Sequence, residues 1–249
     1  MMKNQDKRNG QIIIHVDKLV KKFGNFTANK DLCFDVYKGE IFGFLGANGA
    51  GKTTAIKILS GLSSPTSGTA VVAGFDVYKK TEQIKRNIGY MSQKFSLYED
   101  LTVFENIRFF GGIYGMRAKL IKERTKELLA RLQMTDYANK LISEIPLGWK
   151  QKLAFSVAVL HRPKIVFLDE PTGGVDPITR RQFWDLIYET VEQGITIFVT
   201  THYMDEAEYC HRVSIMVDGR IAALDTPDRL KKQFRAESMN EVFLKLARD

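Results

Sequence analysis

The glycine-rich segment at residues 46–54 has the residue types that bind a chain of phosphates. It follows an apolar stretch predicted as a buried strand (41–45) and begins a predicted helix (52–60). Glycines let backbone N–H groups wrap an anion, and the new helix adds its positive N-terminal end. The Lys52 ammonium can reach the β- and γ-phosphates, and the Thr53 hydroxyl can ligate Mg²⁺. The predicted phosphate-binding residues are Gly46, Ala47, Asn48, Gly49, Ala50, Gly51, Lys52, Thr53 and Thr54.

Two carboxylates follow a second apolar stretch, at residues 165–168. A buried strand there would place Asp169 and Glu170 at its carboxyl end, where open α/β sheets bind ligands. Asp169 would hold Mg²⁺, and Glu170 could act as general base on the attacking water. A strand-ending Asp-Glu pair alone is often a cap or a turn. Its pairing with the glycine segment favours a catalytic role.

The elements that must position these residues alternate between strand and helix patterns, as a layered α/β domain requires. From about residue 95 to 162 nearly every segment has helical period, with Thr102 and Glu105 forming a predicted capping box. The predicted strands are 12–16, 34–36, 41–45, 69–72, 88–91, 164–168, 195–200 and 212–217. The domain therefore divides into an α/β core (11–94 and 163–230), a helical insertion (95–162) and a C-terminal helical tail (231–249), with residues 1–10 as a frayed end.

Composition excludes several classes of protein. No apolar run approaches the roughly 18–20 residues that span a bilayer, so a membrane role would require a partner. The polar start of the chain is unlike a secretory signal. The net charge of +8 is spread along the chain, and its richest stretch, 117–131, fits the solvated face of an amphipathic helix better than a nucleic-acid surface. Cys33 and Cys210 are predicted to be buried thiols in a reducing cytosol.

Four further residues are informative through their order and spacing relative to the two phosphate motifs. Gln93 follows the strand at 88–91, Asp176 ends the segment 171–176, His202 follows the strand at 195–200, and Phe23 precedes Gly24. Each is uninformative alone. Together with the phosphate motifs, they resemble the nucleotide-binding domains of ABC (ATP-binding cassette) transporters over essentially the whole chain.

The resemblance implies a role for each of these residues. Gln93 would sense Mg²⁺ and the membrane partner, and Asp176 would belong to the D-loop. His202 would contact the γ-phosphate, and Phe23 would stack on adenine. The catalytic set implied is Glu170, His202, Gln93 and Lys52, and the Mg²⁺ ligands are Thr53, Gln93 and Asp169.

The resemblance also implies a fold and partners. The fold is a P-loop NTPase core, a RecA-like mixed sheet flanked by helices with an antiparallel β subdomain, plus an inserted α-helical signature subdomain. The cofactors are ATP and Mg²⁺. The partners are a membrane-spanning permease subunit and a second nucleotide-binding domain, with no nucleic acid. The protein would be cytoplasmic and held on the cytoplasmic face of the membrane by the permease.

Two segments look most like exporters of the drug-efflux kind, namely 240–246 and the helix at 204–208. The segment 93–100 would line the groove that receives a short helix of the permease. Its apolar residues Phe95, Leu97 and Tyr98 would serve as anchors, or they simply pack the junction between the subdomains.

The signature motif departs from the family pattern. Where a Leu-Ser-Gly-Gly sequence is usual, residues 145–148 read Ile-Pro-Leu-Gly, with Lys150 and Gln151 fixing the register. In the family this loop crosses a dimer interface to grip the γ-phosphate bound by the other subunit. Pro146, predicted at the first helical position, offers no hydroxyl and no N–H. The N–H groups from about Gly148 onward still point at an anion, which predicts a weakened grip.

Three functions are compatible with these residues. The first is a transport ATPase that drives export of a drug or other small molecule. The second is an ABC ATPase of DNA repair or the ribosome, but the long coiled coil or second cassette of those types is missing. The third is a regulatory cassette that binds ATP without hydrolysing it. The altered signature favours this function, whereas the presence of Glu170 and His202 argues against it.

Overall fold

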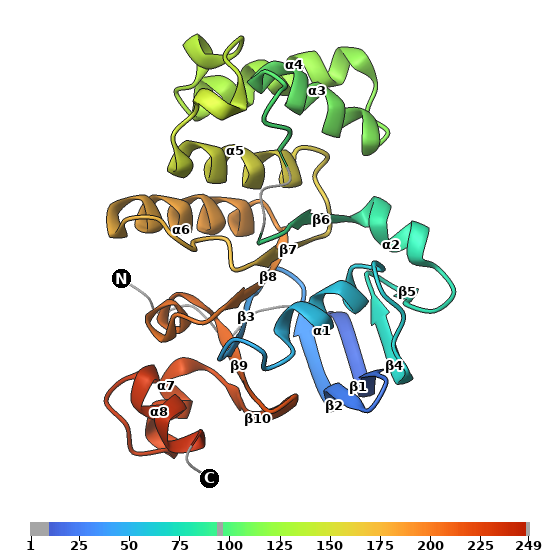
Figure 1. The fold of residues 1–249 in the computed structure, drawn as a ribbon, viewed down its shortest axis with the longest axis vertical. Coiled ribbons are helices and arrows are strands. Elements are labelled where there is room, and N and C mark those ends of the chain that lie inside the picture. Colours follow the sequence, from blue (N-terminus) through green and yellow to red (C-terminus); the bar gives the residue numbers. More distant parts are fainter. Residues whose placement is uncertain (1–9, 94–96, 248–249) are drawn as a thin grey trace.

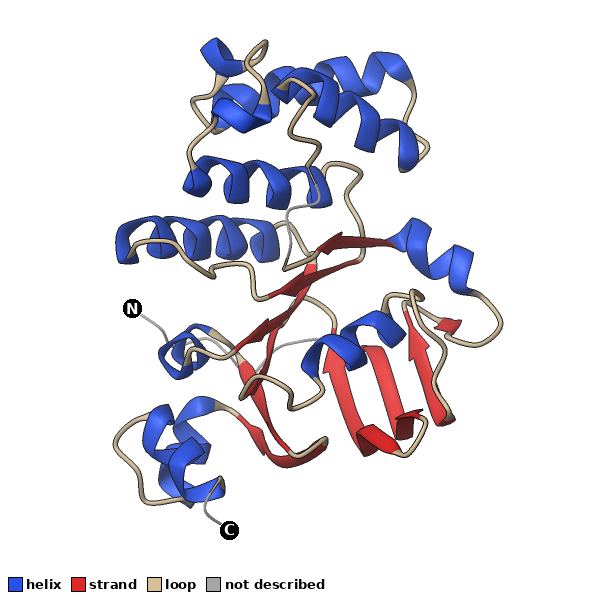
Figure 2. Cartoon of the chain, viewed as in Figure 1, coloured by secondary structure: helices blue, strands red, loops and turns tan. Residues whose placement is uncertain are grey.

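Two sheets and two groups of helices form the domain in the computed structural model, which describes residues 10–93 and 97–247. Most of the predicted frayed end, and Phe95, lie outside the described residues. The central sheet runs through the middle of the molecule, the second sheet lies beside it, and a helical subdomain stands at the far end (Figures 1 and 2).

The central sheet has six strands in the order β10-β9-β3-β8-β7-β6. All neighbouring pairs are parallel except β10 with β9, so the carboxyl ends of five strands meet at one edge. The strand β10 was not predicted, whereas the other five were predicted to within a residue or so. The strands are β3 (Ile41–Gly46), β6 (Ile88–Met91), β7 (Ile165–Asp169), β8 (Thr196–Thr201), β9 (Arg212–Val217) and β10 (Arg220–Asp225).

The second sheet is antiparallel, in the order β2-β1-β4-β5. Its two long strands were predicted only as short pieces at 12–16 and 34–36. Register shifts interrupt their pairing, one of them between Val16 and Leu19, where Lys18 has a φ of 47°. Such bulges break the alternation of apolar residues on which strand prediction depends. The strands are β1 (Ile12–Phe23), β2 (Phe26–Tyr37), β4 (Ser67–Val72) and β5 (Phe75–Asp76).

Alternation along β3 builds two cores, one on each face of the central sheet. Phe42 and Phe44 pack with α1 and the antiparallel sheet, and Ile41 and Leu45 pack with the helices of the other face. All four side chains are 0% exposed. Helix α1 (Lys52–Leu59) follows the phosphate loop after β3, and helix α2 (Thr81–Asn87) leads from the antiparallel sheet to β6 of the central sheet.

The helical subdomain follows β6, and its first helix begins as predicted. The Thr102 hydroxyl accepts the Glu105 N–H, and the Glu105 side chain accepts the Thr102 N–H. The subdomain contains α3 (Val103–Ile113), α4 (Ala118–Arg131), the 3₁₀ turns η1 (Thr135–Tyr137) and η2 (Ile142–Glu144), and α5 (Leu147–Val159).

The remaining helices return to the central sheet. Helix α6 lies alongside α5 and beneath the helical subdomain (Figure 1). Helix α8 packs on η3 and buries Met239 and Val242 in the core. These elements are α6 (Pro177–Glu192), η3 (Met204–Tyr209), α7 (Pro227–Gln233) and α8 (Met239–Leu246).

One prediction about buried side chains needs correction. Cys33 is exposed, because Leu32 and Phe34 point into the core and alternation turns Cys33 outward. Only Cys210 is the predicted buried thiol, and burial raises its pKa well above the usual value. Leu97 is only 5% exposed and belongs to the core, which matches for this residue the alternative that it packs the subdomain junction, whereas Tyr98 is 47% exposed. Among the described residues, no helix combines the length and apolar character needed to cross a bilayer.

Candidate active site

The phosphate loop lies between the carboxyl end of β3 and the first turn of α1. Gly51, which caps the helix, has a φ of 100°, and a Cβ on it would lie 2.3 Å from the Ala28 carbonyl oxygen. Only glycine fits there. The Asn29 side chain holds this turn by donating to the Gly51 carbonyl at 3.1 Å. Ala47, Asn48 and Gly49 are exposed, as a loop that receives a ligand requires.

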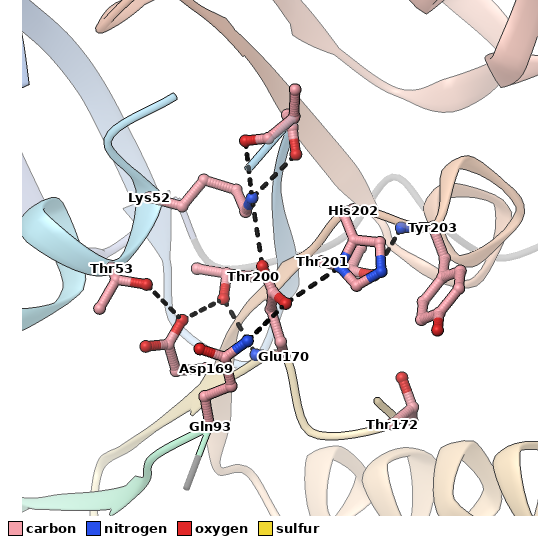
Figure 3. Close-up of polar contacts among 12 residues, drawn as sticks. Lys52, Thr53, Gln93, Asp169, Glu170, Thr172, Thr200, Thr201, His202 and Tyr203 are labelled. Atoms are coloured by element: carbon pink, nitrogen blue, oxygen red, sulfur yellow. Dashed lines mark hydrogen bonds and ion pairs between the residues drawn. The ribbon is translucent and has the colours of Figure 1, made fainter. Parts of the chain in front are cut away.

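Lys52 extends back into the loop and is only 4% exposed. Its ammonium donates to the carbonyls of Gly46 at 2.8 Å and Ala47 at 3.1 Å, and it lies 3.3 Å from Glu170 Oε1 (Figure 3). A buried cation needs such partners. The same donor hydrogens are available to phosphate oxygens when a nucleotide fills the loop.

Thr53 and Asp169 meet across the junction of α1 and β7. The Thr53 hydroxyl donates to Asp169 Oδ1 at 3.2 Å, and the Thr200 hydroxyl donates to the same oxygen at 2.7 Å. A hydroxyl and a carboxylate side by side are hard oxygen ligands of the kind that Mg²⁺ prefers. The neighbouring Thr54 is half-buried at the start of α1.

Glu170 is the point at which the predicted catalytic residues converge. Its Oε2 accepts from Gln93 Nε2 at 3.0 Å and lies 3.0 Å from His202 Nδ1 (Figure 3). Its backbone has a φ of 50°, a conformation that costs a non-glycine residue energy and is concentrated at functional sites. The Glu170 N–H donates to the Thr200 carbonyl and hydroxyl, both at 3.1 Å, which holds the backbone in that conformation.

A cavity of about 260 Å³ opens in front of this carboxylate. It is lined by both of its polar partners and by the loop that follows it: Gln93, Gln151, Glu170, Pro171, Gly173, Gly174, His202 and Tyr203 among others. A water molecule and the end of a phosphate chain would therefore meet a fixed carboxylate, an imidazole and an amide.

The altered signature segment lies outside this cluster, on the rim of another cavity of about 390 Å³. Pro146 is the residue before α5 and not its first residue as predicted, because its ψ of 148° is extended. A Cβ on Gly148 would lie 2.6 Å from Thr179 Cγ2, so a larger residue there would have to displace the Thr179 side chain on α6. The Leu147 side chain is 41% exposed and lines this cavity together with Gly174, on the loop after Glu170.

Asp176 and Gln151 hold that loop at two places. Asp176 caps α6 by accepting from the N–H and the hydroxyl of Thr179, and these hydrogen bonds lower the pKa of its carboxyl. Gln151 on α5 donates to the Gly173 carbonyl at 3.1 Å.

Phe23 stands at the tip of the β1–β2 hairpin, paired with Phe26. The two rings are 55% and 62% exposed, and the Lys21 ammonium lies 5.0 Å from the centre of the Phe23 ring. Both rings are exposed, whereas the sequence pattern had singled out only Phe23.

Comparison with known families identifies the chain. A family model described as ABC transporter matches residues 29–173. The chain belongs to this family. Its ATP-binding cassettes hydrolyse ATP, as the resemblance implied.

Named relatives of this ABC cassette include two bacterial proteins. It is 46% identical over 245 residues to the probable multidrug ABC transporter ATP-binding protein YbhF of Escherichia coli (strain K12), a match that covers 96% of this chain and 42% of that protein. It is 34% identical over 241 residues to the linearmycin resistance ATP-binding protein LnrL of Bacillus subtilis (strain 168), covering 93% and 78%. This chain therefore spans less than half the length of the Escherichia coli protein.

A solved ATP-binding subunit of an ABC transporter has the same fold. Its TM-score is 0.85 at 30% identity, with 94% of this chain and 99% of that chain covered. The predicted P-loop NTPase fold is therefore confirmed.

Sequence reasoning missed two residues that shape this ABC site. Thr200 supports both Asp169 and Glu170, and Asn29 supports the phosphate loop. The parallel register that pairs Asp169 with Thr200 could have revealed the first. No local pattern marks Asn29, which reaches the loop from the antiparallel sheet.

Proposed function

We propose that this ABC cassette hydrolyses ATP at the cluster around Glu170 and drives export through a membrane-spanning permease subunit. The observation that supports the site most strongly is the convergence of Lys52, Gln93 and His202 on one strained carboxylate. Perturbed backbone geometry combined with convergent polar groups is typical of catalytic centres.

In this proposal each side chain has a defined task. The loop N–H groups and Lys52 bind the β- and γ-phosphates, and they oppose the charge that develops as the γ-phosphoryl group leaves. Glu170 accepts a proton from the attacking water. In this structure His202 and Gln93 contact Glu170. In the ATP-bound state their side chains would turn toward the γ-phosphate. Phe23 stacks on the adenine ring.

Mg²⁺ fits the oxygens of Thr53 and Asp169, which lie 3.2 Å apart. Together with Gln93 and the phosphate oxygens of ATP, these residues would hold the ion. Its chemistry there would be to neutralise phosphate charge. The protein contributes the fixed orientation of Asp169, through the Thr200 hydroxyl.

Export of a drug-like or other small molecule is supported by the relatives, one named for multidrug transport and one for linearmycin resistance. We propose that the cassette works on the cytoplasmic face of the membrane, bound to the permease. The ATP-bound state would be a dimer, with the signature segment of each copy facing the phosphates of the other. The exposed Leu147 and Ile178, at 41% and 72%, support an interface there.

The proposed permease contact is an aromatic cluster on the helical subdomain. The Tyr98 ring packs edge-on against Phe109 at 4.9 Å and lies 6.2 Å from Phe110. Tyr98, Phe109 and Ile113 are 47%, 41% and 61% exposed. Exposed aromatic anchors of this kind fit a short apolar helix of the permease.

Cysteine cross-linking tests this contact. In a Cys33→Ser background, which removes the exposed native thiol, Tyr98→Cys should form a cross-link to the permease. Leu62→Cys is the control, since Leu62 is also exposed (54%) but lies at the end of α1, away from the cluster. Equal cross-linking of both positions, or of neither, would place the contact elsewhere.

A regulatory cassette that binds ATP without hydrolysing it is the second candidate, because Pro146 and Leu147 replace the usual Ser and Gly. The steady-state ATPase rate of the purified chain, alone and with its permease, distinguishes the two. Turnover that depends on Mg²⁺ supports the transport ATPase. Stoichiometric ATP binding without turnover in both conditions supports the regulatory role.

A further inference from the structure

A buried carboxylate links the two loops that carry Glu170 and His202. Glu206, on the 3₁₀ helix η3, is 0% exposed, and its Oε1 accepts the Thr172 hydroxyl at 2.5 Å. Thr172 is 1% exposed and lies two residues after Glu170. Glu206 lies four residues after His202. The hydrogen bond therefore joins the two segments at a second place, in addition to the Glu170–His202 contact of 3.0 Å.

These two contacts close a ring of chain and hydrogen bonds. The ring runs from Glu170 to Thr172, crosses to Glu206, returns along the chain to His202, and crosses back to Glu170. Figure 3 shows Thr172 on the loop that leaves Glu170, with Tyr203 next to His202. Because the two loops are joined at both places, the segment that carries His202 is held relative to the segment that carries Glu170.

Arg180, in the first turns of α6, supports the ring from outside. Its Nε lies 3.7 Å from Glu206 Oε1, and its guanidinium lies 4.2 Å from the centre of the Tyr203 ring. The Tyr203 and His202 rings are 4.2 Å apart, centre to centre. The cation thus contacts both the buried carboxylate and the aromatic neighbour of the imidazole.

This arrangement is unfavourable for the stability of the fold. Within the part of the chain that the structure describes, neither Glu206 Oε2 nor Arg180 Nε has a hydrogen-bond partner. A buried charge with incomplete partners costs free energy, and apolar replacements of buried ion pairs are often neutral or stabilising. An apolar side chain would fill the same space at lower cost, so packing alone does not account for a carboxylate here.

We propose that Glu206 is a positioning residue for hydrolysis: through Thr172 it fixes the segment of His202 relative to Glu170. The inference rests on the proposed roles of Glu170 and His202. The Glu206 side chain acts through Thr172, with Arg180 beside it, so it should affect the chemical step and not ATP binding.

The test uses isosteric changes at Thr172, because removing a buried carboxylate could disturb folding. Thr172→Val keeps the shape and removes the donated hydrogen, whereas Thr172→Ser keeps the hydroxyl. Thr172→Val should lower kcat about tenfold or more, since small misplacements of catalytic groups cost that much. The KM for ATP and the affinity for a fluorescent ATP analogue should change less than about twofold. Thr172→Ser should restore kcat to near the wild-type value.

Coupling between the two residues is the second readout. Glu206→Gln should retain most of kcat, because its amide oxygen can still accept from Thr172. Glu206→Leu should lower kcat as much as Thr172→Val, and the double variant should be no slower than either, because all three lack the same hydrogen bond. Additive losses would overturn the proposal.

Other outcomes are equally decisive. A normal kcat in Thr172→Val, while Glu170→Gln is inactive, would reject the role of Glu206 and leave the proposed function intact. Full activity of Glu170→Gln would reject the proposed function itself. Parallel losses of kcat, nucleotide affinity and melting temperature in both Thr172→Val and Thr172→Ser would assign the pair to stability alone.

Discussion

Restoring the usual residues of the signature segment should tighten the ATP-bound dimer. Pro146 precedes α5 with an extended ψ of 148° and no side-chain cap, so a serine fits the same backbone. Leu147 is 41% exposed and lines the same cavity as Gly174, and its removal would let backbone approach the phosphate. The double change Pro146→Ser with Leu147→Gly therefore adds a hydroxyl and removes bulk at the proposed interface.

The magnitude follows from one hydrogen bond to a charged phosphate oxygen. Such a bond contributes about 1.5–3 kcal/mol, or roughly a 10- to 150-fold lower dimer dissociation constant for each site that forms it. A serine before a helix also stabilises that helix by about 1 kcal/mol. That gain is present in monomer and dimer alike, so it does not alter the dissociation constant.

Analytical ultracentrifugation with saturating ATP and Mg²⁺, in the Glu170→Gln background, measures the effect. Pro146→Ala with Leu147→Gly is the matched control, because it removes the proline ring and the leucine without adding a hydroxyl. A dimer that is unchanged or weaker after the serine change would refute the reasoning. It would mean that the backbone has adapted to Pro-Leu, or that this segment never grips ATP.

Two further predictions concern nucleotide binding and pH. Lys52→Ala should abolish useful affinity for a fluorescent ATP analogue, because a charge-assisted contact to phosphate is lost. Phe23→Ala should weaken binding of the analogue less, by about 1–3 kcal/mol of binding free energy. The reverse ranking of the two affinities would contradict both assignments. Burial lowers the pKa of His161 to about 4, so the neutral ring stabilises the fold above pH 6.5, and this stability is lost as the pH falls toward 4. His161→Phe keeps the stack on Tyr114 and should reduce the loss of stability between pH 6.5 and 4. The free energy of unfolding at pH 4 should differ by on the order of 2 kcal/mol, once the partial exposure of the ring is allowed for. The melting temperature should therefore fall less in the variant than in the wild type. An identical decline in both proteins would assign it to other groups.

The strands that carry catalytic residues could be predicted because each is a short, fully buried apolar run. Strands β3 and β7 are buried at every position, and each ends in a polar motif. Burial on both faces leaves a clear signal in sequence. The capping box of α3 was equally local, since it depends on two residues three positions apart.

The parts that escaped prediction depend on contacts distant in sequence. The length of β1 is hidden by bulges, and the exposure of Cys33 depends on which face of β2 the second sheet covers. Thr200 and Glu206 look like ordinary residues until β7 and β8 pair and η3 folds over the loop after Glu170. The burial of Leu97 is set by the packing of the helical subdomain, which no local pattern encodes.

The ATPase activity of Glu170→Gln tests the central claim most directly. Glutamine keeps the shape of the side chain but cannot accept the proton of the attacking water. The variant should bind ATP as the wild type does, hydrolyse it roughly 10²–10⁴-fold more slowly, and accumulate as an ATP-bound dimer. Glu192→Gln, at an exposed position of α6, should hydrolyse ATP at the wild-type rate. Near wild-type turnover by Glu170→Gln would contradict the assignment of Glu170 as the base, and with it the site described around that carboxylate.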